Sequence, residues 1–324
     1  MPLSGLTANK KFLISAKLIL GGAILAYIIF QLHPAVLYSS FLNGNVHLIT
    51  IAVVLVIPNI GFQYWKWRYL VLILKPNASN SEIGGSLFAG FATGIITPAR
   101  IGELAGRALY LRSVNKMEAV GLTIVDKTAS LLITMSAGLL GVFYILLRLY
   151  NLSPYLWYPL FILLLLFVAV CTWLISHPPF AWEIVNAFDV NGSTHRRLKT
   201  LFESLRRMQS PQDLFLLSLS LLFYLTFLLQ CVLLVQAFEQ ADIIESVAAL
   251  AAAFFAKTVI PSVTFGELGI REGAALYFLS LFGYAASSAV NASLILFSCN
   301  VLFPSLIGLF FVPRLSLSAV NGKS

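Results

Sequence analysis

Long apolar stretches are the feature that most constrains how this chain can fold. A helix needs about 20 apolar residues to cross the ~30 Å hydrocarbon core of a bilayer. Only 10% of the residues are charged, whereas a soluble domain has roughly a quarter. The sequence therefore predicts an all-α, polytopic transmembrane helix bundle. Its full-length spans are expected at 12–32, which we interpret as an uncleaved first span, and at 47–73, 117–147, 155–175, 213–237 and 289–312.

The shortage of charge also excludes several classes of protein. Disordered chains, coiled coils and nucleic-acid-binding modules all need far more exposed charge, so no nucleic-acid partner is expected. The net charge of +8 is what basic cytoplasmic loops of a multi-span protein produce. Cys171, Cys231 and Cys299 are isolated, without a CxxC pattern, and the four histidines form no HExxH motif. We therefore expect no metal and no cofactor.

The distribution of basic residues predicts the orientation. Lysines before the first span indicate a cytoplasmic N-terminus, and the loop 33–46, which has no Lys or Arg, is expected outside. The basic loop 176–212 is expected in the cytoplasm, and the acidic turn 239–245 outside. Three basic residues near the end of the second span are assigned to its cytoplasmic flank: Lys66, Arg68 and Lys75.

Three further apolar pieces, at 83–97, 248–263 and 273–287, are short for a full crossing. The first is rich in glycine and stops at Pro98, and the second is interrupted by Lys257 and Pro261. The first two pieces are typical of broken or re-entrant helices. Basic residues after the first piece favour a dip that returns to the cytoplasm, although the sequence leaves open whether 83–97 and 248–263 span or re-enter.

A six-residue pattern occurs twice. The sequence GELAGR at 102–107 and the sequence GELGIR at 266–271 share the pattern G-E-L-x-x-R, and each follows a short segment and a proline. Corresponding interrupted segments in two halves of a chain indicate a transporter binding site. We therefore predict a single integral membrane domain over 1–324. It contains an inverted repeat of about 47–175 and 213–312, joined by the cytoplasmic loop.

Each copy of the pattern is expected near the start of a helix. Glu and Arg four residues apart share one helix face and can pair. Thr97 and Pro98 resemble an N-cap and first helical residue, and residues 264–267 resemble a capping box. Helix N-termini attract anions. The alternative is that these Glu-Arg pairs only stabilise the fold.

Additional charges lie in or beside the apolar segments. Each charge facing lipid at mid-bilayer would cost about 3 kcal/mol on insertion scales, so these groups must face one another, water or the interface. A polar cavity inside the bundle is the simplest arrangement. The predicted substrate-binding residues are Arg100, Glu103, Arg107, Asp126, Lys127, Lys257, Glu267, Arg271 and Glu272.

These residues resemble a known family, the flippase-like membrane proteins grouped with the transmembrane region of lysylphosphatidylglycerol synthases. The matching elements are 98–107, the Asp126-Lys127 pair where the family usually has an acid and Arg, 261–272, and the aromatic segment 65–69. The resemblance implies a prokaryotic plasma-membrane protein that moves a polar lipid, such as an aminoacylated phospholipid or a glycolipid, between leaflets. With the chain ending at Ser324, we expect no soluble aminoacyl-transferring domain.

The leading hypothesis is translocation of a lipid headgroup, with four cations holding a phosphate: Arg100, Arg107, Lys257 and Arg271. Glu103, Glu267 and Glu272 would balance them or meet a cationic headgroup. The sequence has no G-x-x-x-x-G-K-[ST] motif, so nucleotide hydrolysis is not expected. We expect that the protein itself is not an enzyme. The expected partners are membrane lipids and a separate enzyme that modifies lipids. A lipid-modifying enzyme and a small-solute transporter remain alternatives.

Overall fold

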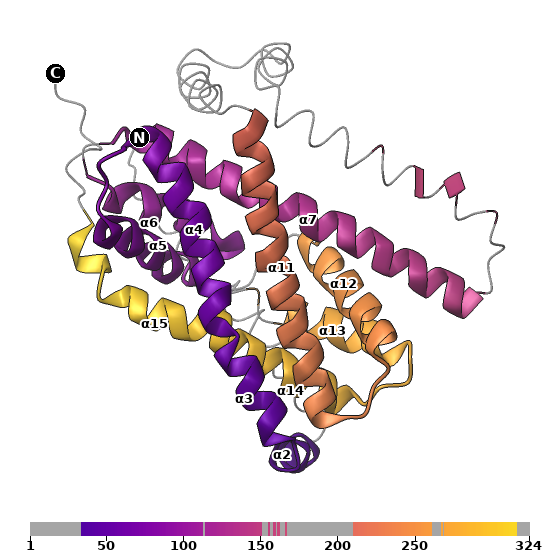
Figure 1. The fold of residues 1–324 in the computed structure, drawn as a ribbon. Coiled ribbons are helices and arrows are strands. Elements are labelled where there is room, and N and C mark those ends of the chain that lie inside the picture. The colour runs from indigo at the N-terminus through magenta and orange to yellow at the C-terminus, as the bar shows by residue number, and fades with distance from the viewer. Residues whose placement is uncertain are drawn as a thin grey trace, which may run out of the picture.

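The structure is a computed structural model that describes residues 34–112, 114–150, 210–260, 267 and 269–315, with isolated positions between 155 and 166. Within these residues all secondary structure is helical (Figure 1). The predicted spans 12–32 and 155–175 and most of the loop 176–212 lie outside the continuous described ranges. Because every described element of secondary structure is a helix, the predicted all-α fold is confirmed.

Four long helical segments are apolar and long enough to cross a membrane. Each agrees with a predicted span: 47–73, 117–147, 213–237 and 289–312. The first segment consists of α3 (Val46–Val54) and α4 (Val56–Leu74). The second segment is α7 (Lys116–Tyr150), and the third is α11 (Ser210–Phe238). The last consists of α14 (Ala286–Phe297), the π-helical turn η4 (Ser298–Leu302) and α15 (Phe303–Leu309). Short helices precede and follow them, α2 (Pro34–Leu42) and η5 (Val312–Arg314).

The glycine-rich segment forms a tight helical hairpin. Helix α5 (Asn80–Ile95) leads through the turn η1 (Pro98–Arg100) into α6 (Gly102–Tyr110), which packs back along it. The approach is close because of glycine: a Cβ at Gly102 would lie 2.2 Å from the Thr93 carbonyl oxygen. The Thr97 hydroxyl accepts the Gly102 N–H at 2.7 Å. Thr97 therefore accepts one N–H at the start of α6, but the predicted N-cap at Thr97 and the predicted start at Pro98 are both wrong, because the N-cap residue of α6 is Ile101.

After α11, the helix α12 (Ile243–Val259) lies along α7. Gly138 and Gly141 of α7 face carbonyl oxygens of α12, and a Cβ at Gly141 would lie 2.5 Å from the Ala248 oxygen. Small residues at such contacts let helix backbones approach closely in membrane proteins. Helix α12 passes through Lys257 without a break, so the predicted interruption at this residue is wrong.

Helix α13 (Ile270–Ser280) carries the end of the second motif. It begins later than the predicted capping box, whose residues 264–266 lie outside the described part of the chain. The Glu272 carboxylate accepts the Gly269 N–H at 2.7 Å and so caps this helix. The apolar piece 273–287 is divided between α13 and α14, because Gly283 turns the chain with a φ of 82°.

The ends of the α3–α4 segment and of α11 pair at both ends of the bundle, and the orientation relative to a membrane stays a prediction. Tyr69 near the end of α4 contacts Phe215 near the start of α11, with ring centroids 4.9 Å apart. At the opposite end, the Asn45 N–H donates to the Ala237 carbonyl at 2.7 Å. The two ends that adjoin the loops predicted outside thus lie together (Figure 1). The inverted repeat and the re-entrant position of the short segments stay predictions.

Candidate functional site

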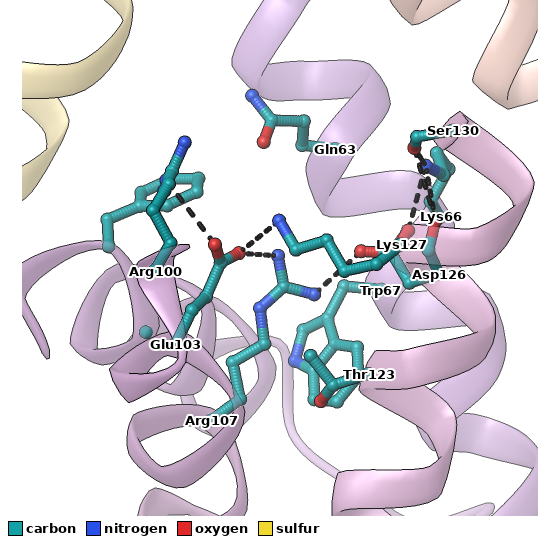
Figure 2. A network of polar contacts seen from close by, with 12 residues as sticks. Gln63, Lys66, Trp67, Arg100, Glu103, Arg107, Thr123, Asp126, Lys127 and Ser130 are labelled. Carbon is teal, nitrogen blue, oxygen red and sulfur yellow. Dashed lines mark hydrogen bonds and ion pairs between the residues drawn. The ribbon is translucent and has the colours of Figure 1, made fainter. Parts of the chain in front are cut away.

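Glu103 on α6 is the centre of a cluster of cations (Figure 2). One carboxylate oxygen lies 2.6 Å from Arg107 Nη2 and 2.7 Å from Lys127 Nζ. The other oxygen lies 3.3 Å from Arg100 Nη2. The pair predicted within the first motif, Glu103 with Arg107, is therefore confirmed. Because only 1% of Glu103 is exposed, these contacts replace the water that the carboxylate loses.

Asp126 on α7 joins this cluster to α4. Its oxygens lie 2.9 Å from Arg107 Nη1 and 2.8 Å from Lys66 Nζ. The Lys66 ammonium also donates to Ser130 Oγ at 2.5 Å. Lys66 is only 2% exposed, so its predicted place on the cytoplasmic flank is wrong. An ion pair with a carboxylate sixty positions away in the sequence, on another helix, allows the lysine to lie inside the bundle.

Arg107 is completely buried. Both of its terminal nitrogens bind carboxylates, and its guanidinium lies over the Trp67 ring at 4.7 Å. The indole N–H of Trp67 in turn donates to Ser86 Oγ at 2.6 Å. A guanidinium held on an aromatic face and between two carboxylates has fixed geometry. Arg107 thus links α6 to α7 and orders the cluster.

The second motif is arranged differently from the first. Glu267 precedes α13, has a φ of 63° and pairs with Lys257 Nζ at 2.6 Å. The expected helical pair of Glu267 with Arg271 is wrong, because Glu267 lies outside the helix. Arg271 instead contacts Glu272 at 3.3 Å, and its guanidinium lies over the Phe297 ring at 5.0 Å.

The two charged clusters border neighbouring cavities that share lining residues. A cavity of about 460 Å³ lies against the first cluster, and one of about 140 Å³ lies against the second. Residues from both motif regions line both cavities, so the two motif regions meet at this polar space, by which we mean the two cavities together. The shared lining residues are Gln63, Arg100, Thr134, Phe223, Lys257, Thr258 and Glu267.

Nearly all of the predicted site residues lie at this space. Seven of them line the cavities: Arg100, Glu103, Asp126, Lys127, Lys257, Glu267 and Arg271. Arg107 and Glu272 are buried directly behind them. With Lys66, the described residues place six cations against four carboxylates, an excess of two positive charges. Such a space favours an anion.

Three non-glycine residues in the described part of the chain have a positive φ, and all line this space. They are Ala99 at 51°, Arg100 at 54° and Glu267 at 63°. The left-handed conformation costs about 1 kcal/mol or more for a residue with a Cβ. Strain of this kind clusters at functional sites, where it orients side chains. Here the strained backbone occurs at one cation, Arg100, and at one carboxylate, Glu267.

Sequence reasoning missed the polar face of α4. Asn59, Gln63 and Lys66 lie at spacings of four and three residues, which is one helix face, and all line the cavities. That spacing inside an apolar span was a signal that could have identified them. Tyr224 and Asn300 also line the smaller cavity and had no such signal, because single polar residues are common in spans.

The fold and the site define a helical membrane protein with a charged cavity lined by residues of both motif regions. The comparison with known families agrees: residues 14–308 match the family described as the lysylphosphatidylglycerol synthase TM region. The chain therefore belongs to this family, whose members are related to lipid handling. No curated protein and no solved structure gave a match. In the described ranges, no group of three His, Cys, Asp or Glu residues is placed to hold a metal.

Proposed function

We propose that this protein moves a phosphate-bearing polar lipid between the two leaflets of a membrane. The headgroup would pass through the charged cavity while the acyl chains stay in the bilayer. The observation that carries this proposal is that Arg100 from the first motif region and Lys257 beside the second line the same space. Charge-assisted hydrogen bonds to a phosphate offset part of the cost of removing it from water.

The exposure of the side chains suggests separate roles. Arg100, Lys127 and Lys257 have side chains that are 24%, 43% and 23% exposed, so they are the proposed phosphate ligands. Arg107 was expected among these ligands, but both of its terminal nitrogens bind carboxylates. We therefore assign Arg107 a positioning role: it holds Glu103, which in turn orients the two exposed cations beside it.

Translocation breaks no chemical bond, so we propose that the protein is not an enzyme. The proposed location is the plasma membrane of a prokaryote, with the N-terminus in the cytoplasm. The two loops predicted outside lie at the same end of the helices, as this proposal requires. Membrane lipids are the proposed partners, and a separate enzyme that modifies the lipid is a further one.

The proposal is tested by leaflet exchange of labelled lipids in reconstituted vesicles. We expect Lys257→Gln to slow exchange of phosphatidylglycerol about tenfold, because a hydrogen bond to a charged group contributes about 1.5–3 kcal/mol. Lys75→Gln is the matched control: its ion pair with Glu82, at 2.7 Å, has side-chain exposures of 25% and 16%, close to the 23% and 18% of Lys257 and Glu267.

Three other results would contradict the proposal. Equal exchange by wild type and Lys257→Gln would remove the cavity from the pathway. Chemically altered lipid, detected by mass spectrometry after incubation with activated donors, would indicate an enzyme. Uptake of soluble solutes without any change in lipid sidedness would indicate a solute transporter.

A further inference from the structure

A further pocket lies outside the internal cavities, where the hairpin of α5 and α6 meets η5. Its volume is about 280 Å³. Six residues around the start of α5, the end of α6 and η5 line it, and they include no lining residue of the two internal cavities: Ser79, Ser81, Glu82, Tyr110, Arg112 and Arg314. This pocket is therefore separate from the site described above.

The two arginines of this pocket have a held backbone and a free side chain. The Arg112 N–H donates to Glu82 Oε1 at 2.8 Å, and the Arg112 carbonyl accepts Lys75 Nζ at 3.1 Å. The Arg314 N–H donates to the Phe311 carbonyl at 3.1 Å. Within the described part of the chain, neither guanidinium forms an ion pair or a hydrogen bond. Both charges are therefore available to a ligand.

The carboxylate of the pocket, Glu82, does not neutralise these arginines. Its oxygens lie 2.7 and 3.0 Å from Lys75 Nζ, so its charge is balanced by that lysine. The two guanidinium groups are left as a local excess of two positive charges. Like charges that line one pocket repel each other, and an anion bound there replaces the repulsion by attraction. The charge distribution thus favours an anionic ligand.

Hydroxyl groups add hydrogen-bond donors to the same pocket. Tyr110 is 8% exposed, and its ring lies against that of Phe311, with centroids 6.0 Å apart. Its hydroxyl has no hydrogen-bond partner in the described ranges, yet it is not one of the unpaired atoms that lack accessible surface. A ligand in the pocket can therefore reach it. The Ser79 hydroxyl accepts the Glu82 N–H at 3.2 Å, which leaves its own proton to donate.

We propose that this pocket binds a phosphate group between Arg112 and Arg314, as an anion site separate from the internal cavities. The planar fork of a guanidinium matches two phosphate oxygens, and the hydroxyl groups can donate to the others. The volume of about 280 Å³ greatly exceeds the roughly 10–15 Å³ that one water needs, so a group of several non-hydrogen atoms fits. The phosphate belongs either to a lipid headgroup or to a free phosphate ion, and both have the same chemistry.

Phosphate binding is measured on the full chain in a maltoside detergent, which carries no phosphate, through the thermal unfolding midpoint. In one arm inorganic phosphate is titrated, with sodium chloride of equal ionic strength as the reference. In the other arm short-chain phosphatidic acid is titrated. We expect a saturable rise of the midpoint, and the arm that saturates at the lower concentration identifies the source. Arg112→Gln and Arg314→Gln should each weaken this binding about tenfold, because each removes a charge-assisted hydrogen bond.

Two further variants make the result specific to the pocket. Arg148→Gln is the matched control: it removes the same charge from an exposed arginine that pairs with Glu245 outside the pocket, at 3.7 Å, and it should bind phosphate like wild type. Lys257→Gln removes a cation of the internal cavities. A midpoint rise that persists in Lys257→Gln therefore belongs to the pocket, whether or not the protein translocates lipid.

Three results would overturn this phosphate site. The first is the absence of a midpoint rise in both arms. The second is equal weakening of binding by Arg148→Gln and by the two pocket variants, which would indicate an effect of net charge alone. The third is a rise that Lys257→Gln abolishes and that Arg112→Gln and Arg314→Gln leave unchanged, which would assign the phosphate to the internal cavities and leave the proposed function standing.

Discussion

Lys66 Nζ lies 2.8 Å from Asp126 Oδ1, and this ion pair joins α4 to α7 where both side chains are buried. Asp126 also holds Arg107, at 2.9 Å, so one carboxylate connects three helices. Removing a single member of a buried ion-pair network leaves an uncompensated charge, which costs more than the net value of the intact pair. The network therefore places the cavity walls, and its loss should appear first as loss of stability.

We expect Lys66→Met to destabilise the protein by about 3 kcal/mol, since single breaks of buried pairs cost about 3–5 kcal/mol and Asp126 retains Arg107. The matched change Arg68→Met, two residues away, should cost less than about 1 kcal/mol, because Arg68 contacts only Asn80 and the Trp65 ring among its described interactions. Unfolding curves in detergent measure both. Equal losses for the two variants would contradict the buried network.

The backbone strain at Ala99 predicts a stabilising substitution. With a φ of 51°, Ala99→Gly should raise the free energy of unfolding by up to about 1 kcal/mol, because glycine adopts this conformation without steric cost. Ala105→Gly, six residues on and exposed within α6, should have the opposite sign and lose about 1 kcal/mol. A loss of stability in both variants would show that the positive φ carries no strain.

The close contact of α7 with α12 should not tolerate larger residues. A Cβ at Gly141 would lie 2.5 Å from the Ala248 carbonyl oxygen, so Gly141→Ala should destabilise the protein by about 1–3 kcal/mol through overpacking. Gly61 on α4 has nothing within 4 Å of its Cβ position. Gly61→Ala should therefore stabilise its helix by about 0.5–1 kcal/mol. The thermal unfolding midpoint measures both variants, and a lower midpoint for Gly61→Ala would contradict the open space at Gly61.

The apolar stretches and the duplicated motif predicted much of this structure. Hydropathy alone located the four spans that the structure describes, because burial of apolar residues in lipid sets the length of a helix. The repeat of G-E-L-x-x-R located both sides of the cavity, since charges in an apolar chain must meet one another. The contact of Glu103 with Arg107 followed directly from their spacing.

Other features depend on contacts that spacing does not encode. Ala99 and Arg100 adopt a positive φ that residues with a Cβ rarely adopt, so the true start of α6 had no sequence signal. Lys66 was assigned to a flank because the rule for basic residues counts lysines near span ends. Its partner, Asp126, is brought to it only by the packing of α4 against α7.

Lys127 provides the most direct test of charge at the cavity. Its ammonium lies 2.7 Å from Glu103 Oε1, and its side chain, which is 43% exposed, lines the larger cavity. Lys127→Arg keeps the charge and adds donors that can bind Glu103 and a phosphate together, so we expect lipid exchange to stay within about twofold of wild type. Lys127→Gln removes the charge and should slow exchange about tenfold, a loss of about 1.4 kcal/mol.

Because Lys127 is partly exposed, Lys127→Gln should leave the thermal midpoint nearly unchanged, unlike Lys66→Met in the buried part of the same cluster. Measuring exchange and unfolding on the same preparations therefore separates ligand contact from support of the fold. Slower exchange in Lys127→Gln accompanied by an equal loss of stability would assign Lys127 to the structural network. Equal exchange by Lys127→Arg and Lys127→Gln would show that its charge does not meet the lipid.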